Sequence, residues 1–130
     1  MAKSFRVIDT GDPLETILPG AGLLITAMGV TIAEANVQGV PVAVHYNYQA
    51  DRAQVKQLVE AGLVADLGFH EEITTTDLAA ALGGLWADEA RRRGLARNGL
   101  DRIDGRGARR VADLVARLWG NGEPAKDTSC

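Results

Sequence analysis

Cysteine is nearly absent from this chain of 130 residues. The one cysteine, Cys130, is also the last residue. A single thiol forms neither a disulfide framework nor a cluster of cysteine ligands, so we expect no disulfide and no metal centre. Apolar runs are short, and none reaches the roughly 18 residues that a membrane-spanning helix needs. We expect no secretory leader, because the first residues lack the pattern of one. We therefore expect a cytoplasmic protein.

An excess of positive charge is lacking too. The formal net charge is −3, with 14 basic against 17 acidic side chains. Such a chain has no large basic field to hold a phosphate backbone, so we expect no nucleic-acid partner. Arginines gather at residues 91–93 and at Arg106, Arg109 and Arg110, which we interpret as a solvated helix face. Hydrophobic residues make up 46% and charged residues 24%, as in soluble globular domains.

Strand and helix patterns alternate in the first half of the chain. Apolar runs predict strands at residues 5–8, 22–27, 41–45 and 63–67. The run at 22–27 does not alternate with polar residues, so we expect both its faces to be covered, as in a parallel sheet; the run at 63–67 is more polar and suits an edge. Between these strands we expect three helices. The first is short, with Asp12 as its N-cap and Pro13 as its first residue, and the second spans 31–38 and is capped by Gly39. The third runs from Asp51 to Gly62, with Val55, Leu58 and Val59 facing inward.

The second half is helical. Residues 74–77 form a capping run before a helix with Leu78, Ala81, Leu82 and Leu85 on one face. Asp88 starts an arginine-rich helix that Gly99 is expected to close, and a last helix carries Val111, Leu114, Val115 and Leu118 in one stripe. We assign residues 1–119 to one domain and 120–130 to a disordered tail. The alternation predicts an α/β fold, a Rossmann-like parallel sheet with helices on both faces.

Gly29 occupies the turn between a predicted strand and a predicted helix. A residue without a side chain lets a ligand approach the backbone, and the amides of Val30 and Thr31 would be free donors that favour an anion. The same turn also occurs in proteins without any ligand there. Glu34, three residues after Thr31, is either the partner of Thr31 in a capping box or a carboxylate for the hydroxyls of a ribose. Spacing alone leaves both uses open.

Residues 21–68, "AGLLITAMGVTIAEANVQGVPVAVHYNYQADRAQVKQLVEAGLVADLG", combine an apolar strand, a glycine turn, Thr-x-x-Glu, a helix of small residues, Gly-x-Pro, a strand, a loop with glutamine and a helix ending in Ala-Gly. This order resembles the nucleotide-sugar-binding C-terminal domain of GT-B glycosyltransferases. It is most similar to the N-acetylglucosaminyltransferase of peptidoglycan synthesis and to the UDP-sugar hydrolases of the spore-coat-polysaccharide and pseudaminic-acid pathways. "IDGRGARRVADLV" also looks like the ending of the hydrolase-like branch. The resemblance covers about residues 5–118.

The resemblance implies a set of binding residues for a UDP-sugar. Gly29, Val30 and Thr31 would meet the donor phosphates, and Glu34 would hold the ribose. Gln54 would hydrogen-bond the hydroxyls of the sugar, with Gln57 one turn later as a weaker candidate; for both glutamines the alternative is a solvated helix face. His45 would touch the diphosphate or be a hydrogen-bonded loop residue. Apart from the resemblance, we expect His70 to lie at the surface, and Asp104 and Arg109 to fix the last loop.

The sequence departs from the family at two positions. Met28 replaces the small residue that usually precedes the turn glycine and crowds the phosphate site, and Ala53 replaces one of the paired glutamines next to Gln54. The first strand, the Gly-rich loop and the acceptor domain of the family are missing, which implies a truncated GT-B C-terminal domain without its catalytic base. We therefore expect no catalytic residue and no cofactor in this chain.

Three functions follow. The first is the UDP-sugar-binding half of a glycosyltransferase-like or UDP-sugar hydrolase-like enzyme of polysaccharide or cell-surface glycan biosynthesis, completed by a partner chain that supplies the acceptor domain. The second is a protein-interaction or oligomerisation module, in which an open sheet edge is covered by another copy. The third, a hydrolase acting alone, lacks a nucleophile–base pair. Membrane association is expected only through a partner.

Overall fold

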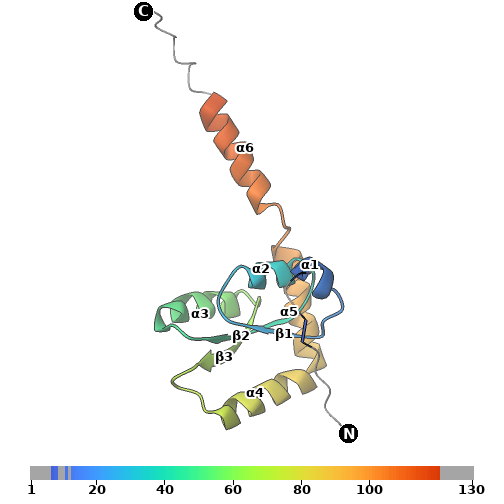
Figure 1. Ribbon diagram of the computed structural model, residues 1–130, viewed down its shortest axis with the longest axis vertical. Helices are drawn as coiled ribbons and strands as arrows, with labels where there is room; N and C mark the ends of the chain where they lie inside the picture. Colours follow the sequence, from blue (N-terminus) through green and yellow to red (C-terminus); the bar gives the residue numbers. More distant parts are fainter. Residues whose placement is uncertain (1–6, 9–10, 12, 121–130) are drawn as a thin grey trace, which may run out of the picture.

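The computed structural model describes residues 7–8, 11 and 13–120 (Figure 1). Three parallel strands form a sheet in the order β1-β2-β3. Helices surround it, as predicted for an α/β, Rossmann-like chain. The elements are α1 (Leu14–Ile17), β1 (Leu24–Thr26), α2 (Thr31–Asn36), β2 (Val42–Tyr46), a 3-10 turn η1 (Gln49–Asp51), α3 (Arg52–Glu60), β3 (Ala65–Phe69), α4 (Thr75–Ala87), α5 (Glu89–Arg102) and α6 (Gly107–Gly120).

The central strand β2 divides the core into two apolar clusters, one on each face of the sheet. Val42 and Val44 are fully buried in a cluster with residues of α2 and α3, whereas Ala43 is buried in a cluster with residues of α4 and α5. Successive side chains of a strand point to opposite faces. The helices therefore cover both faces of the sheet, as expected, and β2 is the strand most completely enclosed.

The expectation that the strand at 22–27 is covered on both faces is wrong. Only Leu24–Thr26 form β1, and Ile25 is 51% exposed. Ile25 pairs with Ala43 of β2, yet the cluster around Ala43 does not include it. Within the described residues β1 is an edge strand, so its outer side lacks the neighbour that covers β2. The predicted edge position of β3 is confirmed. Of the predicted strand at 5–8, residues 5 and 6 lie outside the described residues, and Val7 and Ile8 belong to no strand.

The predicted end of α5 at Gly99 is also wrong, because the helix continues to Arg102. Gly99 is buried inside α5 and faces Asn36 at the end of α2. Here the glycine permits two helices to approach closely instead of ending one of them. The predicted helix at 31–38 with Gly39 as its cap is also wrong in its end, because α2 ends at Asn36 and Val37 is its C-cap. Gly39 and Gly62 have positive φ values of 70° and 69° and lie in the turns after α2 and α3.

Two further details of the helices differ from expectation. Val59 of α3 is 39% exposed, because α3 rests on the core through Val55 and the partly buried Leu58. Pro13 is the N-cap of α1 and not its first residue; Asp12 lies outside the described residues. The predicted capping run before α4 is confirmed: the Thr74 hydroxyl accepts a hydrogen bond from the Asp77 amide at 3.2 Å, and Thr74 N donates to Asp77 Oδ2 at 3.3 Å.

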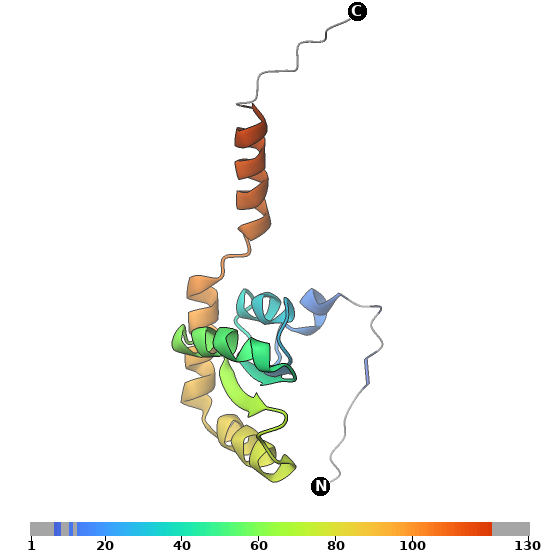
Figure 2. The same ribbon diagram turned by 90° about the vertical axis from the view of Figure 1, so that its left-hand side faces the viewer.

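The last helix stands apart from the sheet. In both views α6 extends from the end of α5 away from the rest of the chain (Figures 1 and 2). No residue of α6 is buried. The predicted stripe of Val111, Leu114, Val115 and Leu118 exists, and every one of its members is more than half exposed.

Candidate functional site

A cavity of about 510 Å³ lies between α2 and α3. Gly29 and Val30 line it on the side where β1 passes into α2, and Gln54 lines it from α3. These three residues come from the two segments that the sequence assigned to donor binding. Met28 lines the same cavity and packs partly buried against the core. The cavity therefore persists beside this methionine. Its other lining residues are Ile32, Ala33, Asn36, Asp51, Leu58, Leu63 and Ile103.

The main chain at Gly29 forms the first turn of α2. Gly29 O accepts from Ile32 N at 3.3 Å, and Val30 O accepts from Ala33 N at 2.9 Å. Within the residues that the structure describes, no backbone bond uses the amides of Val30 and Thr31. A Cβ at Gly29 would meet no atom within 4 Å, and its φ is not positive. A side chain at position 29 would therefore fit the protein, and the backbone conformation there does not require glycine.

The polar groups of this cavity are two amides and one carboxylate. Asn36 is 1% exposed, and its Oδ1 has no hydrogen-bond partner within the described part of the chain. Gln54 is exposed, and Asp51 is half-buried. No lysine or arginine lines the cavity. It can thus enclose an apolar or heteroaromatic group and offer amide hydrogen bonds, while an anion would depend on main-chain donors.

Glu34 lies beside a second cavity of about 400 Å³, which shares Ala33 and Ile103 with the first. Arg102, Asp104 and Arg110 also line it. A carboxylate is a strong acceptor for hydroxyl groups, and a guanidinium binds anions. Glu34 and Gln54 are therefore not brought to one cavity but to two adjoining ones. A third cavity, next to α1, is lined by Glu34 and Gln38 as well.

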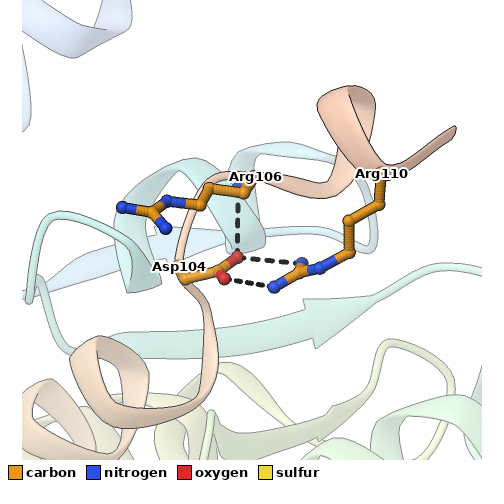
Figure 3. Close-up of polar contacts among 3 residues, drawn as sticks. All are labelled: Asp104, Arg106 and Arg110. Atoms are coloured by element: carbon orange, nitrogen blue, oxygen red, sulfur yellow. Dashed lines mark hydrogen bonds and ion pairs between the residues drawn. The ribbon is translucent and has the colours of Figure 1, made fainter. Parts of the chain in front are cut away.

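Residues of the loop between α5 and α6 line the second cavity. Figure 3 shows the polar contacts of Asp104 in this loop with Arg106 and Arg110. The Asp104 carboxylate accepts from Arg106 N and from Arg110 Nη1, both at 3.0 Å, and its other oxygen pairs with Arg110 Nη2. The hydrogen bond from Arg110 is the largest cause that lowers the pKa of Asp104, followed by that from the Arg106 backbone. The structural role expected for Asp104 is what the structure shows, with Arg110 and not Arg109 as its partner.

The other predicted residues lie outside the first cavity. Thr31 is half-buried and begins α2 as its first helical residue, while Gln57 is an exposed residue of α3. The capping-box alternative for Thr31 and Glu34 is wrong, because Val30 is the N-cap and no side chain caps the helix. His45 Nδ1 lies 2.9 Å from Gly68 O, so its ring faces β3. His70 is exposed.

His45 supports an irregularity of the sheet. Val44 pairs with Asp66, but Tyr46 pairs with Phe69, so β3 contains one extra residue there. Gly68, with a φ of 97°, takes part in this bulge, and its amide donates to Asp66 Oδ1 at 2.7 Å. A bulge shifts the register of the following side chains. The contacts of His45 with the described residues are thus those of a hydrogen-bonded strand residue.

Several residues of these cavities were not predicted. Ile103 is far from Gly29 in sequence, whereas Asn36 follows Gly29 by seven residues. Arg110 belongs to a group of arginines that we interpreted only as a solvated face, and Arg102 was not singled out. A polar residue inside the apolar helix "IAEAN" was the one available signal for Asn36. Among residues 7–8, 11 and 13–120, no three His, Cys, Asp or Glu side chains come together as ligands for a metal ion.

Comparison with known proteins finds a similarity to a curated protein. The chain is 24% identical over 115 residues, 88% of its length, to the spore coat polysaccharide biosynthesis protein SpsG of Bacillus subtilis (strain 168). The match covers 34% of SpsG, so the chain spans about a third of the length of the curated relative that it matches. No model of a protein family matches the chain, and no solved structure matches it.

Proposed function

We propose that this chain binds the UDP-sugar of a glycosyltransferase-like or UDP-sugar hydrolase-like enzyme in polysaccharide or cell-surface glycan biosynthesis. The similarity to SpsG, a polysaccharide biosynthesis protein, supports the process. The observation that carries the site is that Gly29, Val30 and Gln54 line one cavity of about 510 Å³. In parallel α/β sheets, ligands bind where strands end and helices begin.

Each residue has a separate task in this proposal. The diphosphate lies over Gly29 and accepts hydrogen bonds from the amides of Val30 and Thr31. The Gln54 amide hydrogen-bonds hydroxyl groups of the sugar. Glu34 holds the ribose hydroxyls from the adjoining cavity, so the nucleoside extends past Ala33 and Ile103, which line both cavities.

Catalysis in this proposal needs a second chain. Transfer of the sugar requires an acceptor and a base placed next to the anomeric carbon. We assign no residue of this chain to that role. A partner chain that supplies an acceptor-binding domain would complete the enzyme.

An interaction or oligomerisation module is the second candidate. The observation that favours it is the exposed apolar surface: Ile25 on edge strand β1 and the stripe of α6 are each at least half exposed. An exposed edge strand can pair with another chain. This function predicts a partner-dependent assembly and no nucleotide binding.

Calorimetric titration with UDP and UDP-N-acetylglucosamine separates the two functions. Gly29→Ala is the most informative variant, because its Cβ would touch nothing in the protein but would meet a phosphate lying on the backbone. We expect a loss of affinity of about tenfold or more, with an unchanged fold. Gly83→Ala, in α4 and equally without near atoms, is the matched control. If Gly29→Ala binds as tightly as the parent, the diphosphate does not lie there.

Two further pairs test the side chains. Gln54→Ala should weaken binding of the sugar nucleotide by roughly tenfold, whereas Gln57→Ala, outside the cavity, should not. Glu34→Ala should weaken binding of both UDP and the sugar nucleotide, with Glu60→Ala as control. If neither nucleotide binds the parent chain or changes its melting temperature, the UDP-sugar proposal fails and the interaction module is favoured.

A further inference from the structure

α6 carries an apolar face that nothing in the described chain covers. Leu118 is 68% and Trp119 84% exposed, and Val111, Leu114 and Val115 are between 51% and 61% exposed. The helix projects from the body in both views (Figures 1 and 2). Isolated exposed apolar residues are ordinary, but five on one 14-residue helix mark an interaction surface.

The same helix separates apolar from charged residues. Positions 111, 114, 115 and 118 follow the spacing of one helical face, and Trp119 lies beside them. Arg109, Arg110, Asp113 and Arg117 occupy the rest of the circumference. Such a helix buries one side in an apolar medium and keeps the other in water or among polar headgroups.

Charge is distributed unevenly along the chain. Residues 89–120, which contain α5 and α6, hold nine arginines and four acidic residues. Residues 1–88 hold four basic and eleven acidic residues. The helical end is thus positive although the whole chain is negative. An α6 from a second copy would bring the same positive charge to the interface, whereas an anionic surface complements it.

We propose that α6 binds the surface of an anionic lipid bilayer, with its apolar face at the boundary between headgroups and acyl chains. Arg109 and Arg117 lie above that face, toward the headgroups, and Trp119 takes the interfacial position that tryptophan favours. The 14-residue helix is about 21 Å long, and in this proposal it lies along the surface of the bilayer. Within residues 13–120 no helix has the length and apolar content to cross a membrane. The apolar face of α6 lines neither cavity of the proposed nucleotide site, although Gly107 and Arg110 at the start of α6 line the second one.

Vesicle sedimentation tests the proposal with the full chain. Vesicles of equal parts phosphatidylglycerol and phosphatidylcholine should bind it at least about tenfold more strongly than phosphatidylcholine alone, and high salt should weaken the binding. The fluorescence of the chain should shift to shorter wavelength on binding, and Trp119→Phe should remove most of that shift. Absence of binding to the anionic vesicles at low salt overturns the proposal.

Leu114→Asp and Ala116→Asp form a matched pair, because both add one negative charge to α6 but on opposite faces. We expect Leu114→Asp to reduce vesicle binding to background and Ala116→Asp to reduce it only several-fold. Circular dichroism should give both variants the melting curve of the parent body, since neither residue is buried. Equal effects of the two variants would overturn the role of the apolar face. So would a concentration-dependent dimer in light scattering that Leu114→Asp dissociates, because α6 would then pair with a second copy.

Discussion

Gly99 of α5 packs directly against Asn36 of α2: a Cβ at Gly99 would come within 2.8 Å of both the main-chain O and Oδ1 of Asn36. Oδ1 can move with its side chain, but the main-chain O can move only if the backbone of α2 shifts. We therefore expect Gly99→Ala to destabilise the fold by roughly 1–3 kcal/mol, the usual cost of overpacking. Urea denaturation measures this difference.

Gly94→Ala is the control for that prediction. Gly94 lies five residues earlier in α5, and a Cβ there would meet no atom within 4 Å. Alanine is a better helix former than glycine, so Gly94→Ala should stabilise the chain by up to about 1 kcal/mol. Equal effects of the two substitutions would mean that α5 and α2 are not in close contact.

The cap of α4 gives a second prediction. Thr74→Ala removes the hydroxyl that accepts from the Asp77 amide, and should cost about 1 kcal/mol of stability in thermal unfolding. The side-chain hydrogen bond with Thr74 is also the main cause that lowers the pKa of Asp77, so the same variant should raise that pKa. Thr76→Ala, one position before Asp77, should change neither quantity appreciably. An unchanged Asp77 pKa in Thr74→Ala would contradict the capping box.

The bulge in β3 gives a third prediction. Gly68 has a φ of 97° and lies against Ile73, so Gly68→Ala combines an unfavourable backbone conformation with a tight contact. We expect a loss of roughly 1–3 kcal/mol. NMR should also detect a change at the His45 ring, whose Nδ1 lies 2.9 Å from Gly68 O. A variant as stable as the parent would show that the strand has regular geometry there.

The joint between α5 and α6 should depend on pH. Arg110 and the Arg106 amide lower the pKa of Asp104 below its ordinary value in the folded chain. For a lowered pKa, the stabilising contribution is fully present above the ordinary pKa of an aspartate and is lost as pH falls through the lowered one. Acid should therefore loosen this joint, seen as a lower protection factor of the Arg106 amide, which compares its exchange with the intrinsic rate at the same pH.

An NMR titration of the Asp104 carboxyl group checks the cause. Arg110→Gln should move the pKa of Asp104 up toward its ordinary value, while Arg109→Gln, which removes the same charge one residue earlier, should move it less. If both variants leave the titration unchanged, the ion pair does not form in solution.

The alternation of elements was predictable because local spacing indicates it: short apolar runs such as that around Val42 and Val44 favour buried strands, and the Thr74–Asp77 cap is a local hydrogen-bond pattern. The exposure of Ile25 was not predictable, since it depends on whether a further strand lies beside β1. The role of Gly99 was missed for a similar reason, because a glycine near a helix end and a glycine at a helix crossing look alike in sequence.

The candidate site was predictable in part. Gly29, Val30 and Gln54 lie around one cavity because a turn after β1 and the start of α3 are neighbours in a parallel sheet. The separate position of Glu34 depends on how α2 is rotated and on where residues 102–110 pack. Those are long-range contacts that no spacing along the chain specifies.

The isolation of α6 has a thermodynamic consequence. A helix of 14 residues without tertiary support is only marginally favoured in water. Its helical population should therefore rise whenever a surface covers the apolar side. The free energy of that association then includes the cost of ordering residues 107–120. Far-ultraviolet ellipticity would then report occupancy, while the near-ultraviolet signal of the body stays constant.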